Sequence, residues 1–256
     1  MKCIAVFGRK GGSGKTQVSH FLSHGLAMCG YPTIMLQTDV RAGRPPEFLD
    51  GRNYMLASTL GEGGDVVGKI EKIIEQARRL PGSVLVIDGG ANRRNVDLAF
   101  APLADLILIP TGYSPEDIAV AQADYEEFAE EFRRRGRAPE VYIVMNRWPG
   151  LYRKLTSVKG RPWIRDFFRD TDKAENRFPY YIPDMPSLLD MAHGEAPRYT
   201  PLIDGKSRSF ASLVALKIGL TDEIPEPMSD DEDDDDGSSS APPMAYEPPR
   251  RAYGTR

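Results

Sequence analysis

The sequence predicts an α/β protein whose doubly wound, mostly parallel sheet is covered by helices on both faces. Three features carry this prediction: apolar runs of strand length, helical periodicity between several of them, and polar or glycine-rich turns that separate the two. The runs are continuous rather than alternating, as expected for parallel strands that are buried on both faces. Because 41% of the 256 residues are hydrophobic and 27% are charged, the chain can bury one full core.

The expected elements follow one another in strand–helix order. Residues 3–7 form the first apolar run, and a helical repeat follows the glycine-rich turn after it. Further continuous runs predict strands at residues 33–36, 84–87, 106–109 and 141–145. The stretch after Pro115 is expected to be an amphipathic helix, because apolar side chains step by three and four at Ile118, Ala121, Tyr125, Phe128 and Phe132. This alternation of strands and helices indicates a doubly wound sheet.

Beyond Pro149 the pattern becomes weaker. A basic and aromatic region, residues 152–178, precedes a short strand-like run at 180–182 and a last helix near 207–218. After Leu220 the composition changes, because seven consecutive acidic residues, 230–236, precede a segment rich in glycine, serine and proline. Such a segment cannot bury enough apolar surface to offset the entropy of ordering it. We therefore predict one folded domain at residues 1–222 and a disordered acidic tail at residues 223–256.

Charge is distributed unevenly along the chain. The net charge is −4, but residues 221–256 hold eleven acidic and three basic side chains. The first 220 residues therefore carry 30 basic against 26 acidic side chains, a net charge of +4. A charge this small is compatible with nucleic-acid contact but does not require it, because it is more often that of an ordinary solvated surface. The chain has two cysteines, Cys3 and Cys29, which suit reduced apolar positions better than a disulfide or a metal site.

A phosphate-binding loop is predicted between the first strand and the first helix. The segment Gly8-Arg-Lys-Gly-Gly-Ser-Gly-Lys-Thr16 fits the P-loop pattern, in which glycines turn backbone N–H groups toward phosphate oxygens at the start of a helix. Lys15 would neutralise the β- and γ-phosphates, and the Thr16 hydroxyl would bind Mg²⁺. An ordinary glycine-rich turn is disfavoured, because the strand and the helix that the motif requires are both expected here. The sequence therefore predicts binding of ATP with Mg²⁺.

Lys10 distinguishes this loop from a general P-loop, which needs no lysine at that position. The form K-G-G-x-G-K-T at residues 10–16 resembles the deviant Walker A motif of the ParA/MinD ATPases. The resemblance extends over about residues 1–220 and is strongest in the first half. It implies a P-loop NTPase fold, and it implies that Lys10 reaches across a dimer interface to the nucleotide of the partner subunit. A solvated loop lysine is the alternative for Lys10.

The same resemblance implies two carboxylates at the Mg²⁺ and hydrolysis site. Asp39 ends the segment Leu36-Gln-Thr-Asp39, which is similar to the family's paired-aspartate segment, although Gln37 stands where the first aspartate is usual. Asp88 ends the run Val84-Leu-Val-Ile-Asp88, which looks like a Walker B strand. A turn-forming and a strand-capping aspartate are the respective alternatives. The predicted metal ligands are Thr16, Asp39 and Asp88, and the predicted catalytic residues are Lys10, Lys15, Asp39 and Asp88.

The resemblance also provides candidates for binding the rest of the nucleotide. Asn146 and Arg147 follow an expected strand at the position from which family members contact adenine, and an amide can both donate to and accept from the base edge. A turn-forming role for Asn146 stays open as the alternative. Pro183 lies in Ile182-Pro-Asp184, which resembles a later loop beside the base. The full predicted set is Lys10, Gly11, Gly12, Ser13, Gly14, Lys15, Thr16, Gln17, Asn146, Arg147 and Pro183.

The resemblance implies an ATPase with slow intrinsic turnover that positions or segregates a cargo, as in plasmid or chromosome partition or in conjugation. ATP would drive formation of a homodimer that binds nonspecific DNA, and a ParB-like or other cargo-bound adaptor would stimulate hydrolysis. No apolar run approaches the roughly 18 residues that cross a bilayer, so we expect a cytoplasmic, nucleoid-associated protein without a membrane partner. The candidate DNA contacts, each alternatively a solvated charge, are Arg133, Arg134, Arg135, Arg137, Arg153, Lys154, Lys159, Arg161 and Arg165.

Two other functions would use the same nucleotide site. A membrane-cycling ATPase of the MinD kind needs a basic amphipathic helix at its end, whereas this chain carries an acidic run that anionic lipid would repel. A phosphotransferase similar to bacterial tyrosine kinases is suggested only by Tyr246 and Tyr253, and the lysine at position 10 favours the partition branch.

Overall fold

The computed structural model describes residues 1–38, 52–58, 66–90, 94–148, 174–185, 188 and 199–223. The strands are β1 (Lys2–Val6), β2 (Thr33–Gln37), β3 (Met55–Ser58), β4 (Val84–Asp88), β5 (Leu106–Thr111), β6 (Val141–Trp148) and β7 (Arg177–Pro183). The helices are α1 (Lys15–Met28), α2 (Val66–Arg78), α3 (Arg94–Phe100), α4 (Pro115–Arg134) and α8 (Pro201–Lys217), with a short 3₁₀ helix at Ala101–Leu103.

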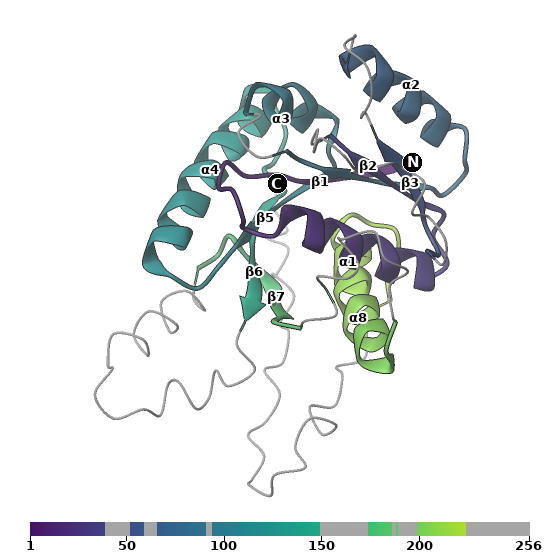
Figure 1. Cartoon of the computed structure of the whole chain (residues 1–256). Helices are drawn as coiled ribbons and strands as arrows, with labels where there is room; N and C mark the ends of the chain where they lie inside the picture. Colours follow the sequence, from purple (N-terminus) through teal and green to yellow (C-terminus); the bar gives the residue numbers. More distant parts are fainter. Residues whose placement is uncertain are drawn as a thin grey trace, which may run out of the picture.

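One parallel sheet organises these elements. Its strand order is β3-β2-β4-β1-β5-β6-β7, and every strand pair in it is parallel. Helices α1 and α8 cover one face of the sheet, and α2, α3 and α4 cover the other (Figure 1). This arrangement confirms the predicted fold class. Because the strands are parallel, the carboxyl ends of β1, β2, β4, β5 and β6 all lie at the same edge of the sheet.

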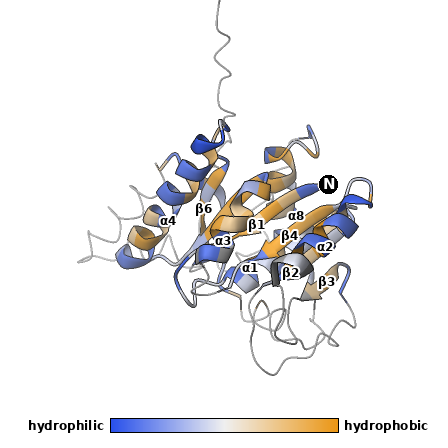
Figure 2. Ribbon diagram, turned by 90° about the horizontal axis from the view of Figure 1, so that it is seen from above, coloured by the Kyte–Doolittle hydropathy of each residue, from blue (hydrophilic) through white to orange (hydrophobic). Residues whose placement is uncertain are grey.

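Strand β1 shows why the apolar runs of the sequence are continuous. Ile4 and Val6 pack into the core under α1 and α8, whereas Cys3, Ala5 and Phe7 pack into the core under α2, α3 and α4. Both faces of the central strands are therefore buried, and both need apolar side chains. Figure 2 shows hydrophobic strands in the middle of the molecule and helices with many hydrophilic residues around them.

The packing of α1 against α8 depends on Gly25 and Phe210. A methyl group at Gly25 would overlap the backbone carbonyl of Ser207, so the glycine permits close approach of the two helices. The ring of Phe210 is fully buried, and its centroid lies 6.0 Å from that of Phe21 and 5.5 Å from that of Phe178. Phe210 thus joins α1, α8 and β7 in one core.

Local signals explain where the two long helices begin. At α4, the Ser114 hydroxyl accepts a hydrogen bond from the Asp117 N–H, and Pro115 occupies the first turn. At α8, Thr200 caps the Ile203 N–H in the same way. Helix α4 confirms the predicted amphipathic helix after Pro115. Helix α8 begins at Pro201, earlier than the predicted 207–218.

The five strands predicted from continuous apolar runs are confirmed, and the strand-like run at 180–182 is the middle of β7. Strand β3 was missed because it has four residues, lies at the edge of the sheet and leaves Met55 largely exposed, so its sequence shows no long apolar run. The predicted tail, except Glu223, lies outside the described residues, as does most of the basic and aromatic region at 152–178.

Substitution of Phe210 by alanine should lower the free energy of unfolding by about 3–5 kcal/mol, because it leaves a cavity between α1, α8 and β7. Leu202→Ala is the matched control in the same helix, since Leu202 is largely exposed and its loss should cost less than about 1 kcal/mol. Denaturant unfolding followed by circular dichroism measures both. Equal effects of the two substitutions would contradict the proposed packing.

Candidate functional site

The loop between β1 and α1 has the backbone conformation of a phosphate-binding loop. Gly8, Gly12 and Gly14 have φ angles of 145°, 76° and 90°, a region that residues with a Cβ atom rarely adopt. A side chain at Gly14 would also overlap the amide nitrogen of Asn146. The glycines are therefore needed for the shape of the loop, as the motif predicts.

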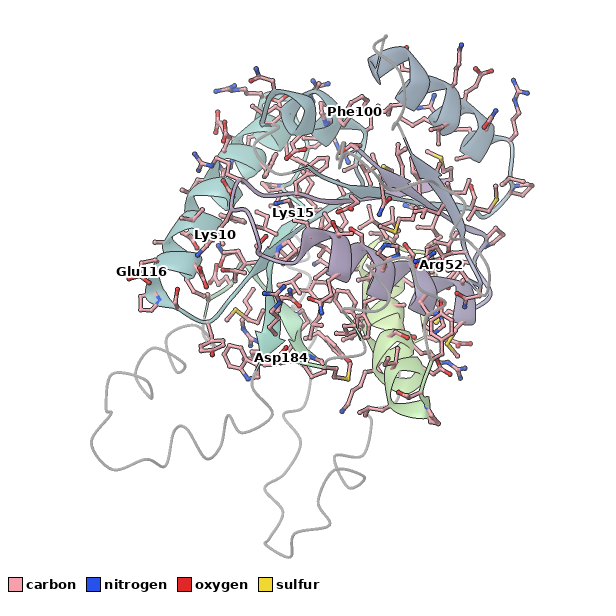
Figure 3. The ribbon with its side chains drawn as sticks, viewed as in Figure 1. Lys10, Lys15, Arg52, Phe100, Glu116 and Asp184 are labelled. Carbon is pink, nitrogen blue, oxygen red and sulfur yellow. The ribbon has the colours of Figure 1, made fainter. Side chains whose placement is uncertain are left out.

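The start of α1 is suited to an anion. Gly14 is the N-cap, so no side chain caps the first turn, and this turn contains no acidic residue. Its N–H groups and the positive end of the helix dipole are directed toward the loop. Lys15 is 6% exposed, and its Nζ donates a hydrogen bond to the Lys10 carbonyl over 2.9 Å. Figure 3 shows Lys15 at the start of α1.

The predicted Walker B carboxylate lies beside this turn. Asp88 ends β4, is 1% exposed, and accepts a hydrogen bond from the Ser19 hydroxyl over 3.3 Å. Its backbone carbonyl accepts from both the N–H and the hydroxyl of Thr38, which follows β2. The ends of α1, β2 and β4 are thus joined around Asp88. Asp39 directly follows Thr38 but lies outside the described residues, so its predicted role stays a prediction.

Asn146 and Arg147 lie against the loop from the other side. The Asn146 amide donates to the Ser13 carbonyl over 2.9 Å, and Arg147, whose φ is 55°, approaches the Gln17 side chain with an Nε to Oε1 distance of 3.4 Å. Asn146 is 1% exposed. The structure therefore gives Asn146 a loop-supporting contact that the sequence did not predict, while its contact with adenine stays a prediction.

Pro183, the remaining predicted residue, ends β7 beside the end of β6. It is paired with Trp148 in the sheet, and the N–H of Asp184 donates to the Trp148 carbonyl over 3.0 Å. The ring centroid of Trp148 lies 4.6 Å from that of Tyr181 and 6.5 Å from that of Tyr113. Pro183 therefore lies beside Trp148, which follows Asn146 and Arg147 in β6, and its contact with the nucleotide stays a prediction.

Two carboxylates of α4 hold the loop, and neither was predicted from the sequence. Asp124 is 2% exposed and accepts hydrogen bonds from the backbone N–H of Arg9 and from its Nε. Asp117, two turns earlier on α4, forms an ion pair with the ammonium of Lys10. A signal was present for Asp124, which falls within the apolar stripe of α4, because a carboxylate buried there needs a partner.

The oxygen atoms around the loop fit a nucleotide with magnesium. Ser13 Oγ and Asn146 Oδ1 are buried beside the loop, and neither has a hydrogen-bond partner among the described residues, so both can accept one from a ligand. Thr16 and Asp88 offer hard oxygen ligands, which Mg²⁺ prefers. Within the described ranges, no group of three or more histidine, cysteine or acidic side chains is placed to hold a metal. Mg²⁺ bound largely by phosphates needs only one or two protein ligands.

A polar cluster of His20, Gln37, Arg52 and Tyr54 lies between α1, β2 and the start of β3, and His20 and Tyr54 in it are buried. The Tyr54 hydroxyl accepts from Arg52 Nε over 3.2 Å and lies 2.5 Å from His20 Nδ1. His20 Nε2 is 3.4 Å from the Gln37 amide nitrogen. Burial, and to a lesser extent the Arg52 charge, lowers the pKa of His20 to about 3. An uncharged amide at position 37 therefore faces a neutral imidazole.

All four candidate DNA contacts that the structure describes have partners within the chain. Arg133, Arg134 and Arg135 form ion pairs with Glu130 and Glu131 on the exposed side of α4. The guanidinium of Arg137 donates to the carbonyls of Pro102 and Ala104 and stacks on the ring of Phe132, so it stabilises the end of the 3₁₀ helix. The other five candidates lie outside the described residues.

Of the helices that the structure describes, none is long and apolar enough to cross a membrane.

The sequence matches no protein-family model and no curated protein. Its structure resembles several solved structures. A MinD cell division protein from Aquifex aeolicus is 19% identical with a TM-score of 0.56, over 88% of this chain and 99% of the other. A plasmid partition protein from Borrelia burgdorferi, bound to AMPPNP, is 15% identical with a TM-score of 0.54, over 86% and 98%. The septum site-determining protein MinD from Pyrococcus horikoshii, complexed with Mg-ADP, is 17% identical with a TM-score of 0.55, over 86% and 98%.

The neutral His20 predicts a dependence of stability on pH. The pKa of His20 is near 3 in the folded chain and near 6.5 in the unfolded chain, so the unfolded state binds the extra proton between these values. The contribution of neutral His20 to the free energy of unfolding is therefore fully present above about pH 6.5. Below that pH it falls by up to about 1.4 kcal/mol per pH unit. Urea unfolding of the wild type and of His20→Gln between pH 7 and pH 4.5 measures this slope. If both proteins lose stability equally, His20 is not the responsible group.

Proposed function

The chain has the fold of the ParA/MinD ATPases, and from this premise we propose that it is an ATP-dependent positioning ATPase that hydrolyses ATP to ADP and phosphate. One observation carries the proposal. A loop with three glycines of positive φ opens into an α1 whose first turn has no acidic residue, and the Asp88 carboxylate lies beside that turn. Arranged in this way, these groups can bind a magnesium nucleotide.

Each residue of the site has a separate task in hydrolysis. The ammonium of Lys15 exchanges the Lys10 carbonyl for phosphate oxygens, because a phosphate dianion attracts it more strongly than a neutral carbonyl does. Thr16 and Asp88 would hold Mg²⁺, which would supply positive charge against the charge that develops on the phosphates. Asp39 orients the attacking water. Ser19 and Thr38 keep Asp88 in place through its side chain and its backbone.

Two copies of the chain assemble on ATP in this proposal, and Lys10 of each copy contacts the nucleotide of the other. The support is the K-G-G-x-G-K-T form of the loop together with the exposure of the Lys10 side chain, which is 41% accessible although it belongs to the loop. A lysine that served only its own nucleotide would be expected to lie inside the loop, as Lys15 does.

The cargo-positioning role rests on ATP-dependent binding of nonspecific DNA and on a ParB-like or other cargo-bound adaptor that stimulates hydrolysis. The DNA contact is compatible with the +4 net charge of residues 1–220, and we propose that exposed arginines at the end of α4 make it. Arg133, Arg134 and Arg135 can exchange their glutamate partners for phosphate groups, since exposed ion pairs are weak. Arg137 is not a candidate, because its guanidinium is needed within the fold.

Separate substitutions of the two lysines should distinguish nucleotide binding from assembly. Lys15→Ala is expected to weaken ATP binding roughly 10- to 100-fold, because it removes charged hydrogen bonds to phosphate. Lys10→Ala should bind ATP within about threefold of the wild type but should not form dimers. Calorimetric titration measures the affinity, and light scattering after gel filtration measures the mass with a nonhydrolysable ATP analogue. An ATP-bound Lys10→Ala dimer would contradict the proposed role of Lys10.

Binding to a duplex of arbitrary sequence tests the cargo-positioning role. We expect retention of DNA with ATP, little with ADP, and little for Lys10→Ala with either nucleotide. The affinity with ATP should fall at least about tenfold between 50 and 200 mM salt if two or more phosphates are contacted. Equal retention in all these conditions would count against a partition function. Co-sedimentation with anionic liposomes that requires ATP would instead favour a membrane-cycling ATPase.

A further inference from the structure

Lys10 makes two polar contacts within its own chain. Its backbone carbonyl accepts the hydrogen bond from Lys15 Nζ over 2.9 Å, and its ammonium forms the ion pair with Asp117. The hydrogen bond connects Lys10 to the phosphate-binding lysine, and the ion pair connects it to the first turn of α4. Figure 3 shows Lys10 between Lys15 and Glu116, which adjoins Asp117 in that turn.

The first turn of α4 is built to hold the Asp117 carboxylate at this point. The Ser114 hydroxyl caps the Asp117 N–H over 3.1 Å. A side chain at Gly112 would overlap the Asp117 carboxylate, so the glycine leaves room for it. The amino end of α4 carries the positive end of the helix dipole, which by itself would repel the Lys10 ammonium. Asp117 therefore decides whether Lys10 can stay beside α4.

The neighbouring contact shows that the pair is exchangeable. Asp124 holds Arg9 from a buried position, with 3% of its side chain exposed, and it binds the backbone as well as the side chain. Asp117 binds only the side chain of Lys10, and the two side chains are 20% and 41% exposed. An ion pair open to water is easily replaced by a stronger anion. Asp124 therefore fixes the loop through Arg9, whereas Asp117 can release the Lys10 side chain.

We propose that Asp117 is a positioning residue that retains Lys10 in the nucleotide-free single copy, and that phosphate binding at Lys15 loosens this retention. When the Lys15 ammonium moves to phosphate, the Lys10 carbonyl loses its donor, so the Lys10 backbone is less constrained and the ion pair with Asp117 is weakened already in the single copy. A triphosphate of a second copy, which carries several negative charges against one on Asp117, then takes the ammonium. This inference rests on the proposed ATP-driven assembly, and it makes Asp117 the residue that sets how much ATP-bound protein is needed for dimers to form.

Asp117→Asn tests the proposal, because asparagine keeps the size of the side chain and removes its charge. Two ion pairs break in each dimer, so the variant should dimerise at a protein concentration roughly three- to twentyfold lower than the wild type, with a saturating nonhydrolysable ATP analogue. Glu130→Gln is the matched control, since it removes one charge from the exposed side of the same helix, away from Lys10. Analytical ultracentrifugation measures the dissociation constants. Dimers of Asp117→Asn that are no tighter than those of Glu130→Gln would overturn the proposal.

A second measurement separates this inference from the proposed assembly. Amide hydrogen exchange at residues 116–118 is followed in single copies, at a protein concentration below that of dimer formation, with and without nucleotide. Nucleotide should accelerate exchange there in the wild type and in Glu130→Gln, but not further in Asp117→Asn. If the wild type never dimerises, the assembly fails while this readout still decides the link from Lys15 to α4. An absence of any nucleotide effect in the wild type would refute the link.

Discussion

The conformation of one short loop is the constraint on which the candidate site depends. Gly8, Gly12 and Gly14 must hold positive φ angles so that the backbone N–H groups and the first turn of α1 point toward one place. A loop of this kind has few stabilising contacts of its own, because its glycines have no side chains to pack. Its shape therefore depends on groups that approach it from other parts of the sheet.

Three groups supply this support from different directions. Asn146, at the end of β6, binds the Ser13 carbonyl, and Asp124, on α4, binds Arg9. Asp88, at the end of β4, accepts a hydrogen bond from Ser19 of α1. Because each contact comes from a separate element, the loop is fixed only when the sheet and its helices are assembled. The phosphate site is thus a property of the whole domain.

The electrostatic arrangement adds a second role for α4. Its buried carboxylate at Asp124 anchors the loop, and its exposed carboxylate at Asp117 holds Lys10. One helix therefore contacts two consecutive basic residues of the loop with different degrees of burial. This difference allows the loop to keep its shape while Lys10 changes its partner. It also links the phosphate site to the surface of α4, where Arg133 to Arg135 lie.

The sequence by itself determined the fold class, the five strands with continuous apolar runs and the phosphate-binding loop. The fold class and the strands depend on the pattern of apolar residues, and the loop depends on the backbone freedom of glycine. Both are local properties of the chain. It did not reveal β3, an exposed edge strand of four residues. Nor did it reveal the contacts of Asp117, Asp124 and Asn146 with the loop, since these residues lie more than 100 positions away from their partners. Only the tertiary structure decided those contacts, because the packing of α4 and the register of β6 bring them to the loop.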